Sequence, residues 1–171
     1  MSLSESELSK QFISLLEVNK GILYKVARTY AREEEEIKDL IQEISIQVWK
    51  SFPKFKSDYK FSTWLYRIAL NVAISNLRKE SKRTSSTEPI SARFIQIAAP
   101  PDDPQNEQIN QLYQVIGELK SFDRALMLLY LEEKSYVEIA DILGISESNV
   151  ATKLNRLKKI LKEKILKLNQ L

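Results

Sequence analysis

Residues 135–156 read SYVEIADILGISESNVATKLNR, a pattern typical of a helix-turn-helix. Ser135 and Glu138 form an S-x-x-E capping box, which predicts the start of the first helix. Gly144 stands where the chain must leave that helix, a position that often requires a positive φ angle. Ser146 can then cap the second helix. Because these signals agree in register, we predict a helix-turn-helix whose second helix is shaped for the major groove of DNA.

The second helix separates into two faces when its residues are placed at about 100° per residue. The apolar face would join the small core and contains Val150, Leu154, Leu157 and Leu161. The opposite face carries groups that can pair with base edges or phosphates, namely Ser148, Thr152, Asn155, Arg156 and Lys159. An ordinary solvated helix face is the alternative. It is disfavoured by the seven basic residues that stand between Lys153 and Lys167 against one acid, Glu163.

Composition limits the remaining classes of protein. The chain has 171 residues and three glycines, which suits an all-α protein of one or two small domains. It has no cysteine and no histidine, so disulfides, zinc fingers and histidine-dependent catalytic sites are excluded. The net charge of +3 does not by itself identify a nucleic-acid partner. No apolar run reaches the roughly 20 residues of a membrane helix, and the start is unlike a signal peptide, so we expect a cytoplasmic protein.

The chain divides into three parts by composition. Residues 5–83 and 107–168 are rich in helical periodicity, whereas residues 84–106 hold four of the five prolines and show no steady apolar period. Such a proline-rich, polar stretch is typical of a linker. We therefore predict two small helical domains joined by a flexible linker.

The segment 36–52 predicts an amphipathic helix in the first domain. Its apolar face should be core and consists of Ile37, Leu40, Ile41, Ile44, Val48 and Phe52. The opposite face consists of Asp39, Gln42, Glu43, Ile46 and Lys50. This acidic and amide stripe could bind a basic protein surface, or it could be a solvated stripe with one stray apolar residue. The run 33–36, four glutamates, reads as a solvated helix start that the helix dipole favours.

A second helix is predicted from residue 61, where Ser62 or Thr63 can cap it. Its expected buried face is Leu65, Ile68, Ala69 and Val72. Another face, at steps of three and four, carries Trp64, Arg67, Asn71, Ser75, Arg78 and Lys82. The sequence thus separates an apolar from a polar side along this helix.

Aromatic and basic residues alternate just before this helix. The rings belong to Phe52, Phe55, Tyr59 and Phe61, and the cations to Lys54, Lys56 and Lys60. Rings that stack on bases, with cations that hold phosphates, suit single-stranded nucleic acid. The alternative is that the rings are core, which we expect for Phe52 and Phe61. For Phe55, Tyr59 and Trp64 both interpretations stay open.

Three motifs together resemble the small, two-domain, extracytoplasmic-function sigma factors of bacterial RNA polymerase. They are DLIQE at residues 39–43, FSTWLYRIA at residues 61–69 with Asn71, and the helix-turn-helix. They stand in the order of that family, with the linker between the second and the third. The resemblance covers nearly the whole chain.

The resemblance implies three contact surfaces. The DLIQE helix would bind core RNA polymerase through Asp39, Gln42, Glu43 and Ile46. The loop and helix that follow would capture a base flipped from the promoter −10 element, using Phe55, Lys56, Tyr59, Lys60, Trp64, Arg67 and Asn71. The helix-turn-helix would read the −35 element, with Thr152, Asn155 and Arg156 nearest the bases and Ser148, Asn149, Lys153 and Lys159 nearest the phosphates. Ala151 departs from the basic or polar residue frequent in the family; its methyl group could instead contact a thymine methyl.

The resemblance also implies an anti-sigma partner, no cofactor and no catalytic residue, because the polymerase performs nucleotide transfer. Two alternatives from other classes remain at this point. One is a helix-turn-helix regulator that binds duplex DNA but never binds polymerase. The other is an interaction protein whose helices bind only another protein. The sequence does not specify the promoter, the loop's preferred base or the anti-sigma partner.

Overall fold

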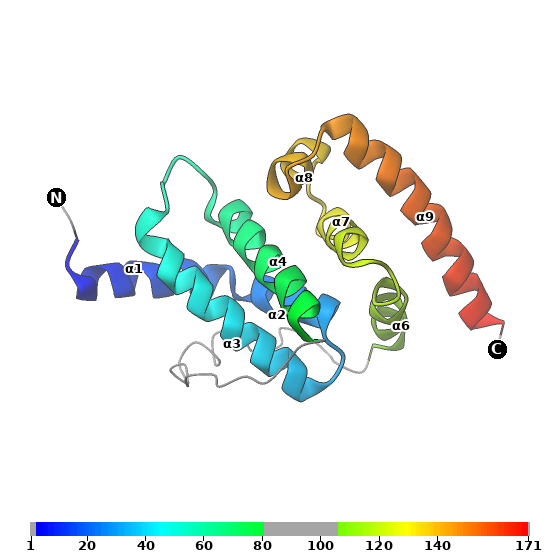
Figure 1. The fold of residues 1–171 in the computed structure, drawn as a ribbon, viewed down its shortest axis with the longest axis horizontal. Coiled ribbons are helices and arrows are strands. Elements are labelled where there is room, and N and C mark those ends of the chain that lie inside the picture. Colours follow the sequence, from blue (N-terminus) through cyan, green and yellow to red (C-terminus); the bar gives the residue numbers. More distant parts are fainter. Residues whose placement is uncertain (1–2, 81–105, 171) are drawn as a thin grey trace.

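The computed structural model describes residues 3–80 and 106–170, and every regular element within these ranges is a helix (Figure 1). The predicted all-α class is therefore confirmed. The predicted linker 84–106 lies outside the described residues except for Asn106, and Lys82 lies outside them as well. The elements are α1 (Glu5–Val18), α2 (Lys20–Tyr30), α3 (Glu34–Ser51), the 3-10 helix η1 (Phe52–Lys54), α4 (Phe61–Glu80), α6 (Glu107–Ile116), α7 (Ser121–Leu131), α8 (Tyr136–Leu143) and α9 (Glu147–Asn169).

The predicted signals of the helix-turn-helix are confirmed in atomic detail. The Ser135 hydroxyl accepts the Glu138 amide at 3.1 Å, and the Glu138 carboxylate accepts the Ser135 amide at 3.2 Å. Gly144 ends α8 with φ 70° and ψ 36°. A Cβ atom at Gly144 would meet no atom within 4 Å, so the backbone angle, and not lack of space, requires glycine. Ser146 caps α9 by accepting the Asn149 amide at 3.1 Å.

The first half is a bundle in which α2, α3 and α4 pack against one another. The predicted apolar face of α3 forms its centre, with Leu40, Ile41, Ile44 and Val48 at most 5% exposed. α1 joins this bundle through the ring of Phe12, whose centroid lies 5.0 Å from that of Trp49. Full burial of such side chains contributes about 1.5–3 kcal/mol each, so this face holds α3 in place.

α4 buries more of its surface than the sequence predicted. Leu65 and Ala69 are fully buried as expected, but Ile68 and Val72 are only half-buried. The other fully packed positions include Tyr66, Leu70 and Ala73, which are at most 2% exposed. The reason is that α4 contacts α2 and α3 on one side and α7 and α8 on the other.

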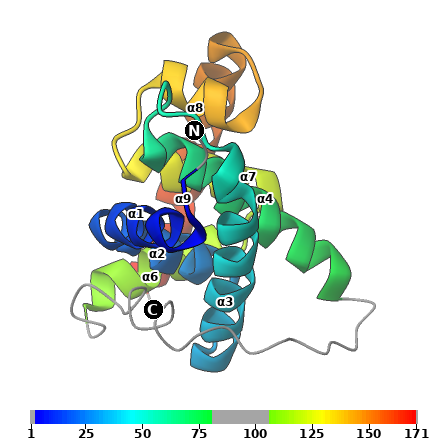
Figure 2. The ribbon, with the colours of Figure 1, turned by 90° about the vertical axis from the view of Figure 1, so that its left-hand side faces the viewer.

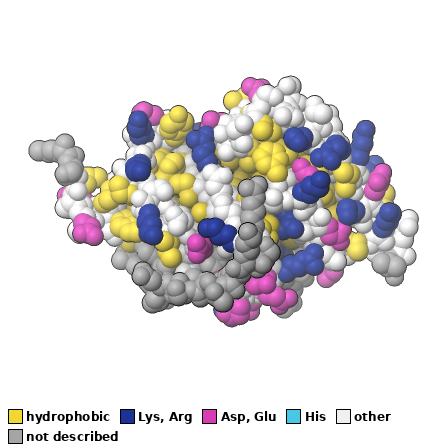
Figure 3. Space-filling view, viewed as in Figure 1, with side chains coloured by type: hydrophobic (Ala, Val, Ile, Leu, Met, Phe, Trp, Pro, Cys, Tyr) yellow, Lys and Arg dark blue, Asp and Glu magenta, His cyan; other side chains and the backbone are white. Residues whose placement is uncertain are grey.

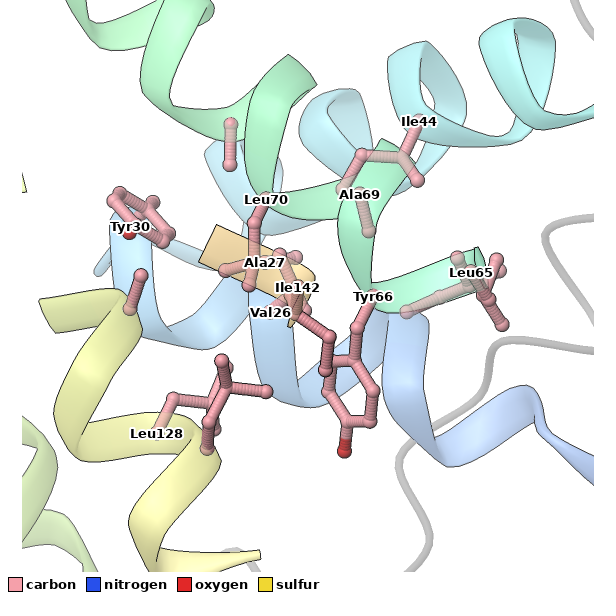
Figure 4. Packing of buried hydrophobic residues seen from close by; sticks show 14 of the residues in the cluster. Val26, Ala27, Tyr30, Ile44, Leu65, Tyr66, Ala69, Leu70, Leu128 and Ile142 are labelled. Atoms are coloured by element: carbon pink, nitrogen blue, oxygen red, sulfur yellow. The ribbon is translucent and has the colours of Figure 1, made fainter. Parts of the chain in front are cut away.

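The two halves share one continuous hydrophobic core in this structure. Figure 4 shows Tyr66 and Leu70 of α4 beside Leu128 of α7 and Ile142 of α8. Polar groups also join the halves: the Tyr30 hydroxyl donates to the Ser121 carbonyl at 2.7 Å. The view in Figure 2, turned by 90°, likewise shows α8 above the first half. The halves therefore form a closed arrangement whose joint lies along α2 and α4.

Candidate nucleic-acid interface

The outer face of α9 is polar and open along the helix-turn-helix. Figure 3 shows Lys and Arg side chains gathered on the part of the molecule where α9 lies. The inner face holds Val150, Leu154, Leu157 and Leu161, which are at most 5% exposed. Of the predicted DNA contacts, the exposed ones are Ser148, Asn149, Thr152, Asn155, Arg156 and Lys159, whereas Lys153 is half-buried. The predicted −35 contacts therefore lie together on the outer side of α9.

Two of these residues also contact their own half. The Arg156 guanidinium lies 3.5 Å from the Asp123 carboxylate of α7, and the Asp123 side chain is 13% exposed. The Lys153 ammonium lies 5.8 Å from the centroid of the Phe122 ring. Arg156 therefore has a structural partner besides its predicted base contact, so the stability of any Arg156 variant must be measured alongside its DNA binding.

A small pocket lies between the loop before α4 and the first turns of α4. It has a volume of about 140 Å³ and is lined by Lys54, Lys56, Tyr59, Thr63, Trp64, Arg67 and Asp141. Four of its lining residues, Lys56, Tyr59, Trp64 and Arg67, belong to the predicted −10 set. Tyr59 is 56% exposed, so its ring can accept a stacking partner.

Three further aromatic rings, those of Phe52, Phe55 and Phe61, pack against Trp64 of the pocket. Phe52 and Phe61 are buried, as expected. Phe55 and Trp64 are half-buried, and their ring centroids lie 5.0 Å apart. The Phe55 ring also packs 5.5 Å from Phe61 in an edge-on arrangement. Phe55 therefore packs against Trp64, which lines the pocket, and is not itself a lining residue.

Of the other predicted −10 residues, Asn71 shares a face of α4 with Arg67, and Lys60 directly precedes the helix. Asn71 is exposed, about one turn beyond Arg67. The Lys60 ammonium lies 3.6 Å from the Glu138 carboxylate of α8. The Arg67 guanidinium donates to the Asp141 carbonyl at 2.7 Å and lies 3.1 Å from the Asp141 carboxylate. Two predicted DNA-binding cations thus contact acids of α8.

The stripe on α3 that was predicted to contact polymerase is accessible. Asp39 is exposed, and Gln42, Glu43 and Ile46 are half-buried on the face away from the core. The glutamates at 33–36 are exposed, and Glu33 caps α3 together with Glu36. Their expected role as a solvated helix start is confirmed.

Sequence reasoning missed three lining residues of the pocket. Lys54 was in the aromatic–basic run and Thr63 was a candidate cap, so both had a local signal that was not used for the site. Asp141 had none, because it lies 74 residues from Arg67 in sequence. No His, Cys, Asp and Glu cluster that could hold a metal ion is present among residues 3–80 and 106–170. Over the same ranges, no helix has both the length and the apolar character to cross a membrane.

Comparison with known proteins assigns the class. Residues 15–83 match the family Sigma-70 region 2, and residues 109–161 match the family Sigma-70, region 4. The ECF RNA polymerase sigma factor SigW of Bacillus subtilis is 29% identical over 90% of this chain and 88% of its own length. The ECF RNA polymerase sigma-E factor of Escherichia coli K12 is 28% identical over 83% of this chain and 81% of its own length.

Solved structures show the same fold. The sigma factor RpoE of Bartonella quintana, in complex with the anti-sigma factor NepR, gives a TM-score of 0.70 at 18% identity, over 91% of this chain and 97% of that one. CnrH in complex with the cytosolic domain of CnrY gives a TM-score of 0.60 at 21% identity, over 91% of this chain and 88% of that one. Promoter-recognising transcription initiation factors are thus the class to which fold and motifs point. The chain belongs to the sigma-70 family and is a sigma factor of the extracytoplasmic-function type.

Proposed function

We propose that this chain binds core RNA polymerase, recognises the −10 and −35 elements of a promoter and directs transcription initiation. The observation that supports it best is the arrangement of the three motif groups. The polymerase and −35 groups lie on accessible faces of α3 and α9, whose opposite faces are packed in the core, and the −10 group lies on the start of α4 and the loop before it. α3 offers the polymerase stripe, α4 and its preceding loop offer the −10 pocket, and α9 offers the −35 face.

The −10 site would act on single-stranded DNA. Extruding a base from a duplex costs a few kcal/mol of stacking and pairing, which the protein must offset. Stacking of a base on an aromatic ring contributes about 1–3 kcal/mol, and the exposed Tyr59 ring can supply it. Lys54, Lys56 and Arg67 would hold the adjacent phosphates. Ring contacts and cations together therefore match what strand opening requires.

The −35 site would act on duplex DNA. α9 would lie in the major groove, where Arg156 can pair with the O6 and N7 atoms of a guanine and Asn155 with an adenine. Lys159 lies about one turn further from the start of α9 and is better placed for phosphate than for bases. Phosphate contacts would position the protein and base contacts would select the sequence.

We assign no catalytic step to this chain, since the polymerase joins the nucleotides. Its action would take place in the cytoplasm, where polymerase and promoters are found. The two solved relatives are bound to the anti-sigma factor NepR and to the cytosolic domain of CnrY, which supports an anti-sigma partner for this chain as well. We further propose that residues 1–83 form the domain that binds polymerase and the −10 element, and that residues 107–171 form the domain that binds the −35 element.

Transcription in vitro tests the proposal. A promoter is first selected from a random-sequence DNA library with core polymerase plus this chain. Run-off transcripts from that promoter should appear only when both are present. The double variant Gln42→Ala, Glu43→Ala should copurify less with core polymerase and initiate less, while its circular dichroism stays unchanged. Initiation by core alone at the same level, or no selection of any promoter, would contradict the proposal.

A further inference from the structure

The acidic side of α8 faces the cations that the −10 site needs. Glu138 and Asp141 are three residues apart and therefore lie on one face of α8, one turn from each other. A neighbouring face of α8, about 100° away around the helix, is held in the core by Ile139 and Ile142, which are 0% and 6% exposed. Packing thus fixes the direction in which the two carboxylates point.

Both carboxylates pair with residues of the proposed −10 site. Lys60 lies 3.6 Å from Glu138, and Arg67 lies 3.1 Å from the Asp141 carboxylate. The same guanidinium nitrogen of Arg67 donates to the Asp141 main-chain carbonyl at 2.7 Å. Asp141 also lines the pocket beside Tyr59 and Trp64. A DNA phosphate that approached Arg67 would have to displace this carboxylate and would be repelled by it.

We propose that α8 is a built-in competitor of −10 DNA: in the free chain, the Glu138 and Asp141 carboxylates occupy the positions that DNA phosphates take at Lys60 and Arg67. This inference rests on the proposed function and concerns the regulation of the same site. The −10 site becomes available when α8 leaves α4. The −35 face of α9 is exposed in the closed arrangement, so closure blocks one DNA surface and not the other.

The ion pairs set the competition, and apolar packing sets the closed position. The paired side chains are 31–76% exposed, and exposed ion pairs of this kind are weak. The closed arrangement itself is held by the core that α2 and α4 share with α7 and α8. Removing the two carboxylates therefore exposes the cations to DNA without unfolding either half. Two such pairs predict a gain of about two- to thirty-fold in affinity for −10 DNA.

The test compares the full-length chain with the double variant Glu138→Gln, Asp141→Asn. Glutamine keeps the capping box at the start of α8, so the helix is preserved. The matched control is Glu107→Gln with Glu163→Gln, which removes two exposed charges from the same half on α6 and α9. The probe is a fluorescent single-stranded oligonucleotide that carries the −10 sequence of the promoter selected in transcription, and a scrambled oligonucleotide corrects for unspecific binding.

We expect the free double variant to bind this oligonucleotide about two- to thirty-fold more tightly than the wild type, and the control variant to bind like the wild type. On core polymerase, where the site must already be open, wild type and double variant should bind equally. Equal binding by the free double variant and the free wild type would overturn the proposal. A gain that is the same on core polymerase would also overturn it, because a general charge effect would then explain it.

A second measurement reports closure without DNA. The chain has no cysteine, so the substitutions Ser14→Cys on α1 and Asn169→Cys on α9 allow specific attachment of a fluorescent dye pair. Energy transfer should show the closed arrangement in the free wild type and a different separation on core polymerase. An unchanged separation would overturn the proposal. The two proposals fail in different ways. If the holoenzyme does not bind the −10 oligonucleotide at all, the proposed function is wrong. If the holoenzyme binds it but the free double variant binds no more tightly than the free wild type, only the competition by α8 is wrong.

Discussion

The two DNA-binding surfaces of this molecule are built in different ways. The −35 surface lies on one helix, α9, whose inner face completes the small core of the helix-turn-helix. The −10 pocket combines a loop, the start of α4 and an acid of α8 that lies 74 residues from its partner Arg67. The first surface is exposed in the closed chain, whereas cations of the second pair with acids of the other half. The −35 surface, which a local motif forms, is thus open, whereas the −10 pocket, which depends on a tertiary contact, is partly covered.

The largest effect is expected where the −35 surface depends on its core. Leu154→Ala removes a side chain that is 0% exposed under the reading face of α9. It should lower the free energy of unfolding by about 2–5 kcal/mol, measured by urea denaturation. Binding to a −35 duplex should fall with it. Leu166→Ala on the same helix, where the side chain is 51% exposed, is the control and should change stability little.

Arg156→Ala and Lys159→Ala should distinguish a base contact from a phosphate contact on α9. Arg156→Ala should cost about 1–3 kcal/mol of duplex affinity and relax the preference at one −35 position. Lys159→Ala should weaken all promoters alike and reduce the salt slope by about one unit. Affinities for single-base −35 variants at several salt concentrations decide this. Because Arg156 pairs with Asp123, unfolding must be measured in parallel. A uniform loss in Arg156→Ala would make it a phosphate contact.

Tyr59→Ala tests whether the −10 pocket stacks a base. Its ring is mostly exposed, so its removal should leave the fold intact. Open-complex formation should lose up to about 1–3 kcal/mol, whereas closed-complex formation should be unchanged. Tyr59→Phe keeps the ring and should behave like the wild type. Equal losses in both complexes would place Tyr59 outside the −10 contact.

Mildly alkaline pH should produce the smallest effect, at the joint between the halves. Burial raises the pKa of Tyr30, and burial together with the Glu132 carboxylate raises the pKa of Tyr66. Stability from these groups is therefore fully present below pH 10, the ordinary tyrosine value, and is lost as pH rises toward the folded values. Each tyrosine should lower the free energy of unfolding by about 0.4 kcal/mol at pH 10 and by more above it. Burial also raises the pKa of Tyr113, so Tyr66→Phe should remove only part of this dependence; a flat profile from pH 8 to 10.5 would contradict the assignment.

The contrast between the two surfaces also explains what the sequence could predict. Caps, Gly144 and the period of apolar residues act within one or two turns, so the helix-turn-helix and its open face could be predicted from local pattern. The burial of Tyr66 and Leu70 could not, since it depends on α4 lying between two layers of helices. The acid at Asp141 could not be assigned to the pocket either, because no local pattern couples residues in separate halves.

Strand opening at a promoter tests the central claim most directly. Permanganate footprinting detects unpaired thymines in the −10 element of the selected promoter, with core polymerase and this chain together and with each alone. We predict reactive −10 thymines only with both present. Tyr59→Ala should lose this reactivity while a gel shift still shows the closed complex. Reactive thymines with core polymerase alone, or equal reactivity in Tyr59→Ala and wild type, would contradict the account.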